Sequence, residues 1–358
     1  MTMSPDSPLP TDPSTDPWAP ARLYTLENAA GLRVQVLDHG ATWVSCSVPM
    51  MDGRRELLLG CASLADYQRQ RAYLGATVGR YANRVRDSRC VVDGQPVTLL
   101  PNEGPHQLHG GPDGYDRRTW TVESHTPQRL VLGLVSPDGD QGWPGEVQAR
   151  VSYTLGQDLA LEIAFETSVS RACPVNLTHH AYFNLDGDAG EATRKVLAHH
   201  LQVLAPAWLP VGADLLPAGE LVPVDDSGFD LRELRRLDQA IAAEPALQVG
   251  QGYDHALALD PSCADALRAA VRLLSSDGRV AMSLATDLPA LQVYSGQGLA
   301  GVPARDGSVY PAHAGIALEP QYLPDSPNHP VAPPHWPDVV QRPGLRRRHV
   351  SRMFFDVA

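Results

Sequence analysis

Residues 147–153 read Val-Gln-Ala-Arg-Val-Ser-Tyr, a strict alternation of apolar and polar side chains. Because successive side chains of a strand face opposite ways, this period of two predicts a strand with one buried face. The same pattern recurs at 34–36, at 44–48 and, less strictly, at 159–165. Many such strands at short spacing predict an all-β fold, a sandwich or a barrel.

Turns and the few helical patterns agree with this class. Asp-Gly pairs predict a hairpin over 90–99 and another over 273–284. Short helices are expected within 63–71 and 231–243. Residues 264–274 look helical by composition, but an Asp-Gly turn follows, so their later half is expected to be a strand. No β-α-β alternation and no Gly-x-Gly-x-x-Gly loop occurs.

The division of the chain follows from its punctuation. We see neither an internal repeat nor a linker within 22–358, so we expect a single domain there. Residues 1–21 are rich in Pro, Ser, Thr and Asp, and we expect a disordered leader. The Pro-rich segment 324–344 is expected to wrap the surface.

Composition excludes several classes of protein. The 358 residues carry 29 basic and 41 acidic side chains and a net charge of −12, which argues against partners such as nucleic acid or an anionic membrane. Five cysteines without C-x-x-C spacing argue against a disulfide framework or structural zinc. With no apolar signal region, reduced thiols indicate a cytoplasmic protein. Lys195 is the only lysine, and its polar surroundings argue against Schiff-base catalysis.

Five short segments, dense in Asn, Arg, His or acidic residues, lie beside the alternating runs. We expect them to meet at strand ends and form one sugar-binding cleft. They are residues 79–84, 108–111, 176–184, 252–255 and 318–328.

His180 and Glu319 are the expected catalytic pair. In an extended segment, His180, Tyr182 and Asn184 share one face, while His179 and Ala181 share the other. Glu319 follows an apolar run, so burial is expected to raise its pKa toward that of a general base at neutral pH. Each also has a structural interpretation, as a hydrogen-bonded histidine or a salt-bridged glutamate.

The remaining candidates would bind hydroxyl groups. Arg84, after Asn83, offers a rigid fork of donors. The two glycines after His109 let backbone approach closely and leave room for a ligand. Asp254 suits a pair of vicinal hydroxyls, and the amide of Gln292 faces away from its apolar neighbours. Structural turns and ion pairs remain open for all of them. Adjacent histidines diverge on a strand, so no metal site is expected.

Together these segments resemble the aldose 1-epimerase (galactose mutarotase) family, in its bacterial branch. The resemblance covers about residues 24–355 and rests on Gly-Arg-Tyr-Ala-Asn-Arg, Leu-His-Gly-Gly, Gly-Tyr-Asp-His, the Pro-Val-Asn-Leu-Thr segment with its following His-x-Tyr-Phe-Asn-Leu, and Leu-Glu-x-Gln. It implies a galactose-mutarotase-like β-supersandwich and cofactor-free interconversion of the α and β anomers of hexoses such as galactose and glucose. It implies His180 as acid and Glu319 as base. The sugar-binding residues that it implies are Asn83, Arg84, His109, Tyr182, Asp254 and Gln292.

Two departures from the family pattern stand out, His179 in place of Asn and Gln297 in place of Asn. We expect His180 in its protonated form to donate to the ring oxygen while Glu319 takes the anomeric proton, from opposite sides of the hemiacetal. Alternatives are a glycosidase with two carboxylates, a non-catalytic hexose-binding module and a hexose-6-phosphate 1-epimerase. The expected partner is a monosaccharide, and the chain is expected to be a monomer or a homodimer.

Overall fold

The computed structural model describes residues 16–194, 196–263 and 265–358. Strands dominate and helices are few and short, which confirms the all-β prediction. Lys195 and residues 1–15 of the expected leader lie outside the described residues. Within that leader, the carbonyl oxygen of Pro17 accepts a hydrogen bond from Leu64 at 2.9 Å, and the Trp18 ring packs on Tyr67 at 6.2 Å between centroids.

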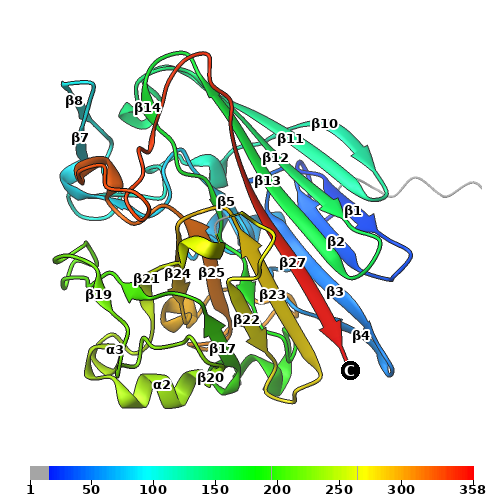
Figure 1. The fold of residues 1–358 in the computed structure, drawn as a ribbon. Helices are drawn as coiled ribbons and strands as arrows, with labels where there is room; N and C mark the ends of the chain where they lie inside the picture. Colours follow the sequence, from blue (N-terminus) through cyan, green and yellow to red (C-terminus); the bar gives the residue numbers. More distant parts are fainter. Residues whose placement is uncertain (1–15, 195, 264) are drawn as a thin grey trace, which may run out of the picture.

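Three antiparallel sheets form the frame (Figure 1). The largest has nine strands, in spatial order β10 (Thr121–Thr126), β11 (Arg129–Ser136), β12 (Val147–Leu155), β13 (Ala160–Val169), β27 (Arg347–Val357), β23 (Val280–Thr286), β22 (Val271–Leu274), β17 (His200–Val203) and β20 (Arg235–Arg236). The second has the order β16 (Tyr182–Phe183), β25 (Ile316–Gln321), β24 (Ala290–Tyr294), β21 (Asp254–Ala258), β18 (Ala207–Trp208) and β19 (Val222–Pro223). The third is β1 (Leu23–Glu27), β2 (Arg33–Leu37), β3 (Trp43–Met50) and β4 (Gly53–Glu56).

Short strand pairs complete the structure. They are β5 (Thr77–Val78) with β15 (Thr178–His179), β6 (Arg84–Val85) with β9 (Gln107–Leu108), β7 (Arg89–Val92) with β8 (Gln95–Thr98), and β14 (Cys173–Pro174) with β26 (Val340–Gln341). The C-terminal strand β27 pairs with β13 on one side and β23 on the other. It therefore joins strands from both halves of the chain in one sheet, as the red strand in Figure 1 shows.

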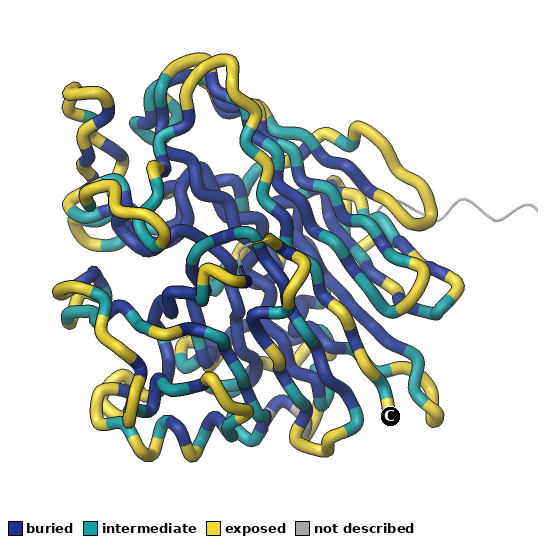
Figure 2. The backbone as a smooth tube through the Cα atoms, viewed as in Figure 1, coloured by how far each residue is buried: buried dark blue, intermediate teal, exposed yellow. Residues whose placement is uncertain are grey.

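Burial follows the alternation seen in the sequence. Every second residue of β12 is buried, and its apolar side chains join one core with those of β2, β3, β13, β25 and β27. Figure 2 shows the dark, buried strands at the centre and the exposed hairpin ends around them. Burial of this apolar area is the main stabilising contribution to such a fold. All five cysteines are buried and free.

Both predicted hairpins and the helix predicted within 63–71 are present. Asp93 and Gly94 have φ of 49° and 78°, as a two-residue hairpin requires, and β22–β23 forms the second hairpin. Helix α1 (Leu64–Arg69) begins after Ser63, whose hydroxyl accepts from the backbone of Asp66. Three short helices of α type are described in all, the others being α2 (Leu237–Ala243) and α3 (Pro245–Val249).

The short helix expected within 231–243 is present as α2, which begins at Leu237 because residues 235–236 pair with β17 as strand β20. The expectation for the Pro-rich segment needs correction. The segment 324–344 is only partly on the surface, since Asp325 is buried and its N–H donates to the Arg84 carbonyl at 3.0 Å. Among the described residues, no helix has the length and apolar character needed to cross a membrane.

Candidate active site

A cavity of about 310 Å³ brings together all eight side chains singled out from the sequence. They come from the five segments described above and, for Gln292, from a sixth. The eight are Asn83, Arg84, His109, His180, Tyr182, Asp254, Gln292 and Glu319.

Four neighbouring strands of the six-stranded sheet supply one wall of this cavity. The strands β16, β25, β24 and β21 lie side by side and carry Tyr182, Glu319, Gln292 and Asp254. Gln292 is directly opposite Glu319 in the register, so both side chains leave the sheet on the same face. Sheet pairing therefore converts three distant sequence motifs into adjacent groups.

The pair of β6 and β9 supplies another wall. The N–H of His109 donates to the Asn83 carbonyl, and the N–H of Asn83 donates to Nδ1 of His109, both at 3.1 Å. Both residues have left-handed backbone, with φ of 65° at Asn83 and 52° at His109. This conformation costs free energy for residues other than glycine. A side chain at Gly110 would overlap the Gly79 carbonyl oxygen, so the close approach expected at this glycine is present.

The alternation around His180 places it in the cavity and its neighbour elsewhere. His180 and Tyr182 line the sugar-sized cavity, whereas His179 and Ala181 face a small void in the core. Nε2 of His179 lies 2.9 Å from the Tyr153 hydroxyl. Asn184 is buried outside the cavity, where its amide donates to the Ala314 carbonyl at 2.7 Å.

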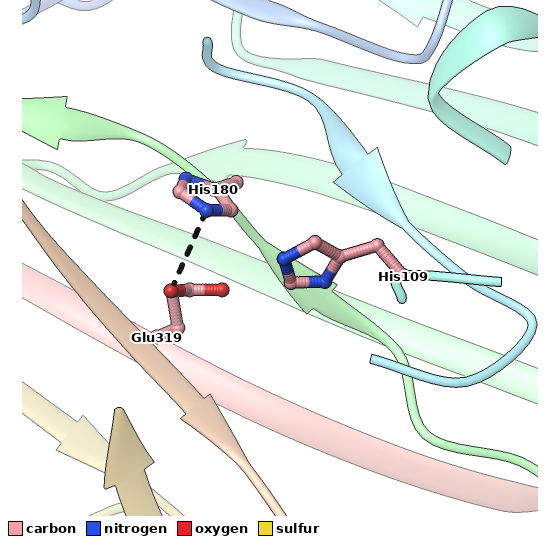
Figure 3. Close-up of side chains that lie close together, drawn as sticks. All are labelled: His109, His180 and Glu319. Atoms are coloured by element: carbon pink, nitrogen blue, oxygen red, sulfur yellow. Dashed lines mark ion pairs between the residues drawn. The ribbon is translucent and has the colours of Figure 1, made fainter. Parts of the chain in front are cut away.

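Figure 3 shows His109, His180 and Glu319 reaching toward one another from three separate segments. Nε2 of His180 lies 3.6 Å from Oε1 of Glu319, and both side chains are almost fully buried. The two groups are thus neighbours in the sugar-free cavity. Because O1 and O5 of a pyranose are bonded to the same carbon, adjacent groups can reach both oxygens.

Burial sets the protonation of this pair. Desolvation raises the pKa of Glu319 well above its ordinary value, with a smaller upward effect of Asp254 and an opposing effect of Arg84. Desolvation lowers the pKa of His180 to about 4. Burial thus raises the pKa of Glu319, as expected, and favours the neutral form of both groups, whereas the expected mechanism starts from a protonated His180.

His109 is a neutral donor. Its pKa is held well below the ordinary value, first by desolvation and then by the nearby His180 and Arg84. Since Nδ1 accepts the Asn83 N–H, the proton of the neutral ring resides on Nε2. The ligand atoms of His109, His180 and Glu319 lie within 4.8 Å of one another, a spacing that suits a metal ion. The tautomer of His109 opposes metal binding. Its Nδ1 is occupied by the Asn83 N–H, and its Nε2 carries a proton and so has no lone pair for a metal.

Two side chains are held by partners at the edge of the cavity. Glu103 accepts from Nε and Nη2 of Arg84 at 2.6 and 2.8 Å, a bidentate pair that fixes the guanidinium plane. The amide of Gln292 donates to Asp254 at 2.7 Å. That bond leaves Oε1 of Gln292 buried without a protein partner among the described residues.

Sequence reasoning missed three residues of this region. Glu103 lies between Asn102 and Gly104, shortly before the Leu-His-Gly-Gly motif, and its charge opposite to that of Arg84 was the only signal. Tyr73 and Tyr294 also line the cavity, and neither stands out by spacing. Gln297 lies behind it, where its amide donates to the Tyr253 carbonyl at 3.1 Å.

Comparison with known proteins settles the family. A sequence model of the family described as aldose 1-epimerase matches residues 22–353. The chain belongs to the aldose 1-epimerase family. It is 44% identical over 326 residues to the aldose 1-epimerase of Escherichia coli K12, covering 91% of this chain and 92% of that protein. It is 37% identical over 334 residues to the galactose mutarotase of Homo sapiens, with the same coverage.

Solved structures of aldose epimerases share this fold. A homologue from C. elegans superposes with a TM-score of 0.85 at 29% identity, covering 94% of this chain and 99% of that one. A galactose 1-epimerase from Lactobacillus acidophilus gives 0.78 at 27% identity, covering 93% and 94%. The fold is thus the galactose-mutarotase-like β-supersandwich, and this aldose 1-epimerase family member is an isomerase that acts on carbohydrates.

Proposed function

We propose that this chain interconverts the α and β anomers of hexoses such as galactose and glucose in the cavity described above. Glu319 takes the proton of the anomeric hydroxyl and His180 gives a proton to the ring oxygen. The C1–O5 bond then breaks, and O1 becomes the aldehyde oxygen. Rotation about C1–C2 presents the other face of the aldehyde, and ring closure returns both protons. The observation that carries this proposal is the 3.6 Å approach of two buried, titratable groups.

The pair carries one proton throughout the reaction. Ring opening begins with carboxylate and imidazolium and ends with carboxylic acid and neutral imidazole. The second arrangement is the one that burial favours in the structure. The low dielectric of the cavity therefore favours the arrangement that accompanies the open-chain sugar. Arg84 opposes this by lowering the pKa of Glu319, which keeps the ionised arrangement accessible.

The other six residues bind and orient the sugar. Arg84 and the Nε2–H of His109 supply donors, whereas Asp254 and the oxygen of Gln292 supply acceptors. Tyr182 supplies an aromatic face whose ring lies 5.0 Å from that of His180. Holding the pyranose in one pose lets proton transfer proceed without a further search for orientation.

Two further proposals concern the cellular location and the oligomeric state of the protein. The odd number of buried, free cysteines supports a reducing compartment, so we infer a cytoplasmic location. A monomer or a homodimer is enough for activity, because the described chain supplies all eight side chains of the cavity.

The direct test of the function is polarimetry. Freshly dissolved α-D-glucose or α-D-galactose is expected to reach anomeric equilibrium much faster with the protein than with buffer, at unchanged equilibrium rotation. A parallel assay with glucose 6-phosphate distinguishes a mutarotase of free hexoses from a hexose-6-phosphate 1-epimerase. Binding of hexose without acceleration would support a non-catalytic module instead.

The pH profile is a second prediction. Because one proton must reside on the pair, kcat/KM is expected to fall below about pH 4, where His180 gains a proton while Glu319 keeps its own. It is expected to fall again at alkaline pH, above the raised pKa of Glu319. Initial polarimetric rates, corrected for spontaneous mutarotation at each pH, measure this. The fall of kcat/KM at low pH is the acid limb of the profile. An acid limb with its midpoint at the ordinary pKa of histidine, 6.5, would contradict the effect of burial on His180.

A further inference from the structure

Tyr73 separates the sugar cavity from a larger one. The neighbouring cavity has a volume of about 650 Å³ and is lined mainly by polar side chains. The two cavities share Arg71, Tyr73 and Leu108 in their walls. Tyr73 is thus a partition between the catalytic pair and a wide polar space.

The ring of Tyr73 packs on both histidines of the site. Its centroid lies 4.6 Å from that of His109, in an edge-on arrangement, and 5.9 Å from that of His180, with only 23° between the planes. Such ring contacts fix orientation as well as burying area. The same ring therefore limits the motion and the hydration of both imidazoles.

The backbone at Tyr73 is strained and anchored to His180. Its φ is 55°, a left-handed conformation that is unusual for a bulky side chain. The next residues bracket the histidine, since the Gly75 N–H donates to the His180 carbonyl and the His180 N–H donates to the Ala76 carbonyl, both at 2.9 Å. Strain that persists beside reacting groups points to function.

The ring of Tyr73 and the ring of His180 have different charged groups around them. Asp116, Glu103, Arg71 and Arg117 act on the Tyr73 hydroxyl, which burial keeps neutral by raising its pKa. The titratable and charged groups around His180 inside the sugar cavity are Glu319, His109, Arg71, Arg84, Asp254, Tyr73, Tyr182 and Tyr294. Asp116 and Arg117 line only the larger cavity, and Tyr73 forms part of the wall that the two cavities share.

We propose that Tyr73 is a positioning residue, whose ring keeps water and the charges of Asp116 and Arg117 away from His180 and so preserves the single-proton state of the catalytic pair. This inference rests on the proposed function. The ring matters and the hydroxyl does not.

Two substitutions separate the ring from the backbone. Tyr73→Gly removes the ring and relieves the left-handed strain, because glycine adopts positive φ freely, so the variant is expected to fold. Its acid limb is expected to rise by about two pKa units toward the ordinary histidine value, lowering kcat/KM at pH 5 about tenfold relative to its own value at pH 8. Tyr73→Phe is expected to keep the wild-type limb. Gln68→Ala, an exposed position that lines only the larger cavity, is the matched control and should also keep it.

Polarimetric pH profiles of these variants decide the matter, with thermal unfolding as the measure of folding. A wild-type acid limb in Tyr73→Gly, or the same displaced limb in Tyr73→Phe, would overturn the role of the ring. A His180→Gln variant assayed in parallel distinguishes failure of the proposed function from failure of the inference about Tyr73. If it retains the wild-type rate, the acid role of His180 in the proposed function fails, whereas an inactive His180→Gln with an undisplaced Tyr73→Gly limb refutes only this inference.

Discussion

Glu319→Gln is expected to lower kcat/KM for hexose mutarotation by about 10²–10⁴-fold, the contribution typical of a positioned acid or base. The amide occupies the same volume beside His180 but cannot take the anomeric proton. Polarimetry of α-D-galactose measures the loss. KM is expected to change much less than kcat, because the other hydroxyl-binding side chains remain.

The same substitution is expected to stabilise the fold at neutral pH. The pKa of Glu319 is raised above the value of 4.5 that applies to the unfolded chain. Below pH 4.5 the carboxyl group is protonated in both states and costs nothing. As the pH rises above 4.5 the unfolded chain ionises first, which favours unfolding until the pH passes the folded pKa. Glutamine removes this effect, so Glu319→Gln should melt higher than wild type at pH 8 and about equally at pH 4.

Glu56→Gln is the matched control for burial of a carboxyl group. Desolvation also raises the pKa of Glu56, but its oxygens accept from the Ser45 hydroxyl and the Cys46 N–H, away from the cavity. Its rate per folded molecule is expected to equal that of wild type. A Glu319→Gln variant with near-native rate would remove Glu319 from the role of base.

His180→Gln is the second large effect, again a loss of about 10²–10⁴-fold. Its amide nitrogen can reach the position of Nε2, the atom 3.6 Å from Glu319, so the change removes proton exchange while keeping a polar group there. The adjacent His179→Gln serves as control, because His179 faces the core and Tyr153. Equal losses in the two variants would point to a structural cause and contradict the assigned role.

The double variant sharpens this result. Because the two groups exchange one proton with one sugar, they are expected to act as a unit, and the losses of units are strongly non-additive. Glu319→Gln combined with His180→Gln should therefore be little slower than either single variant. Multiplied losses would mean that the two side chains act independently.

The sequence predicted much of this protein for identifiable reasons. Long strands such as β12 and β13 were predictable because nine or ten residues display a period of two. The two-residue strands β6, β9 and β16, which place the site residues, are too short to show any period. Their pairing depends on distant partners.

The eight candidate residues and the raised pKa of Glu319 were predictable, whereas the lowered pKa of His180 was not. Motif residues identified the eight side chains of the cavity, and alternation selected His180 over His179. The burial that lowers the pKa of His180 comes in part from the rings of Tyr73, Tyr182 and His109. These rings come together only in the folded chain. Glu103 was missed because its partnership with Arg84 spans a loop with no regular pattern.

The most direct test of the paired proton exchange is a crystal structure of Glu319→Gln with D-galactose bound. We expect residue 319 within about 2.6–3.2 Å of O1 and Nε2 of His180 within the same distance of O5 of the same molecule. A sugar bound with either oxygen beyond reach of its assigned partner, or bound outside this cavity, would contradict the account.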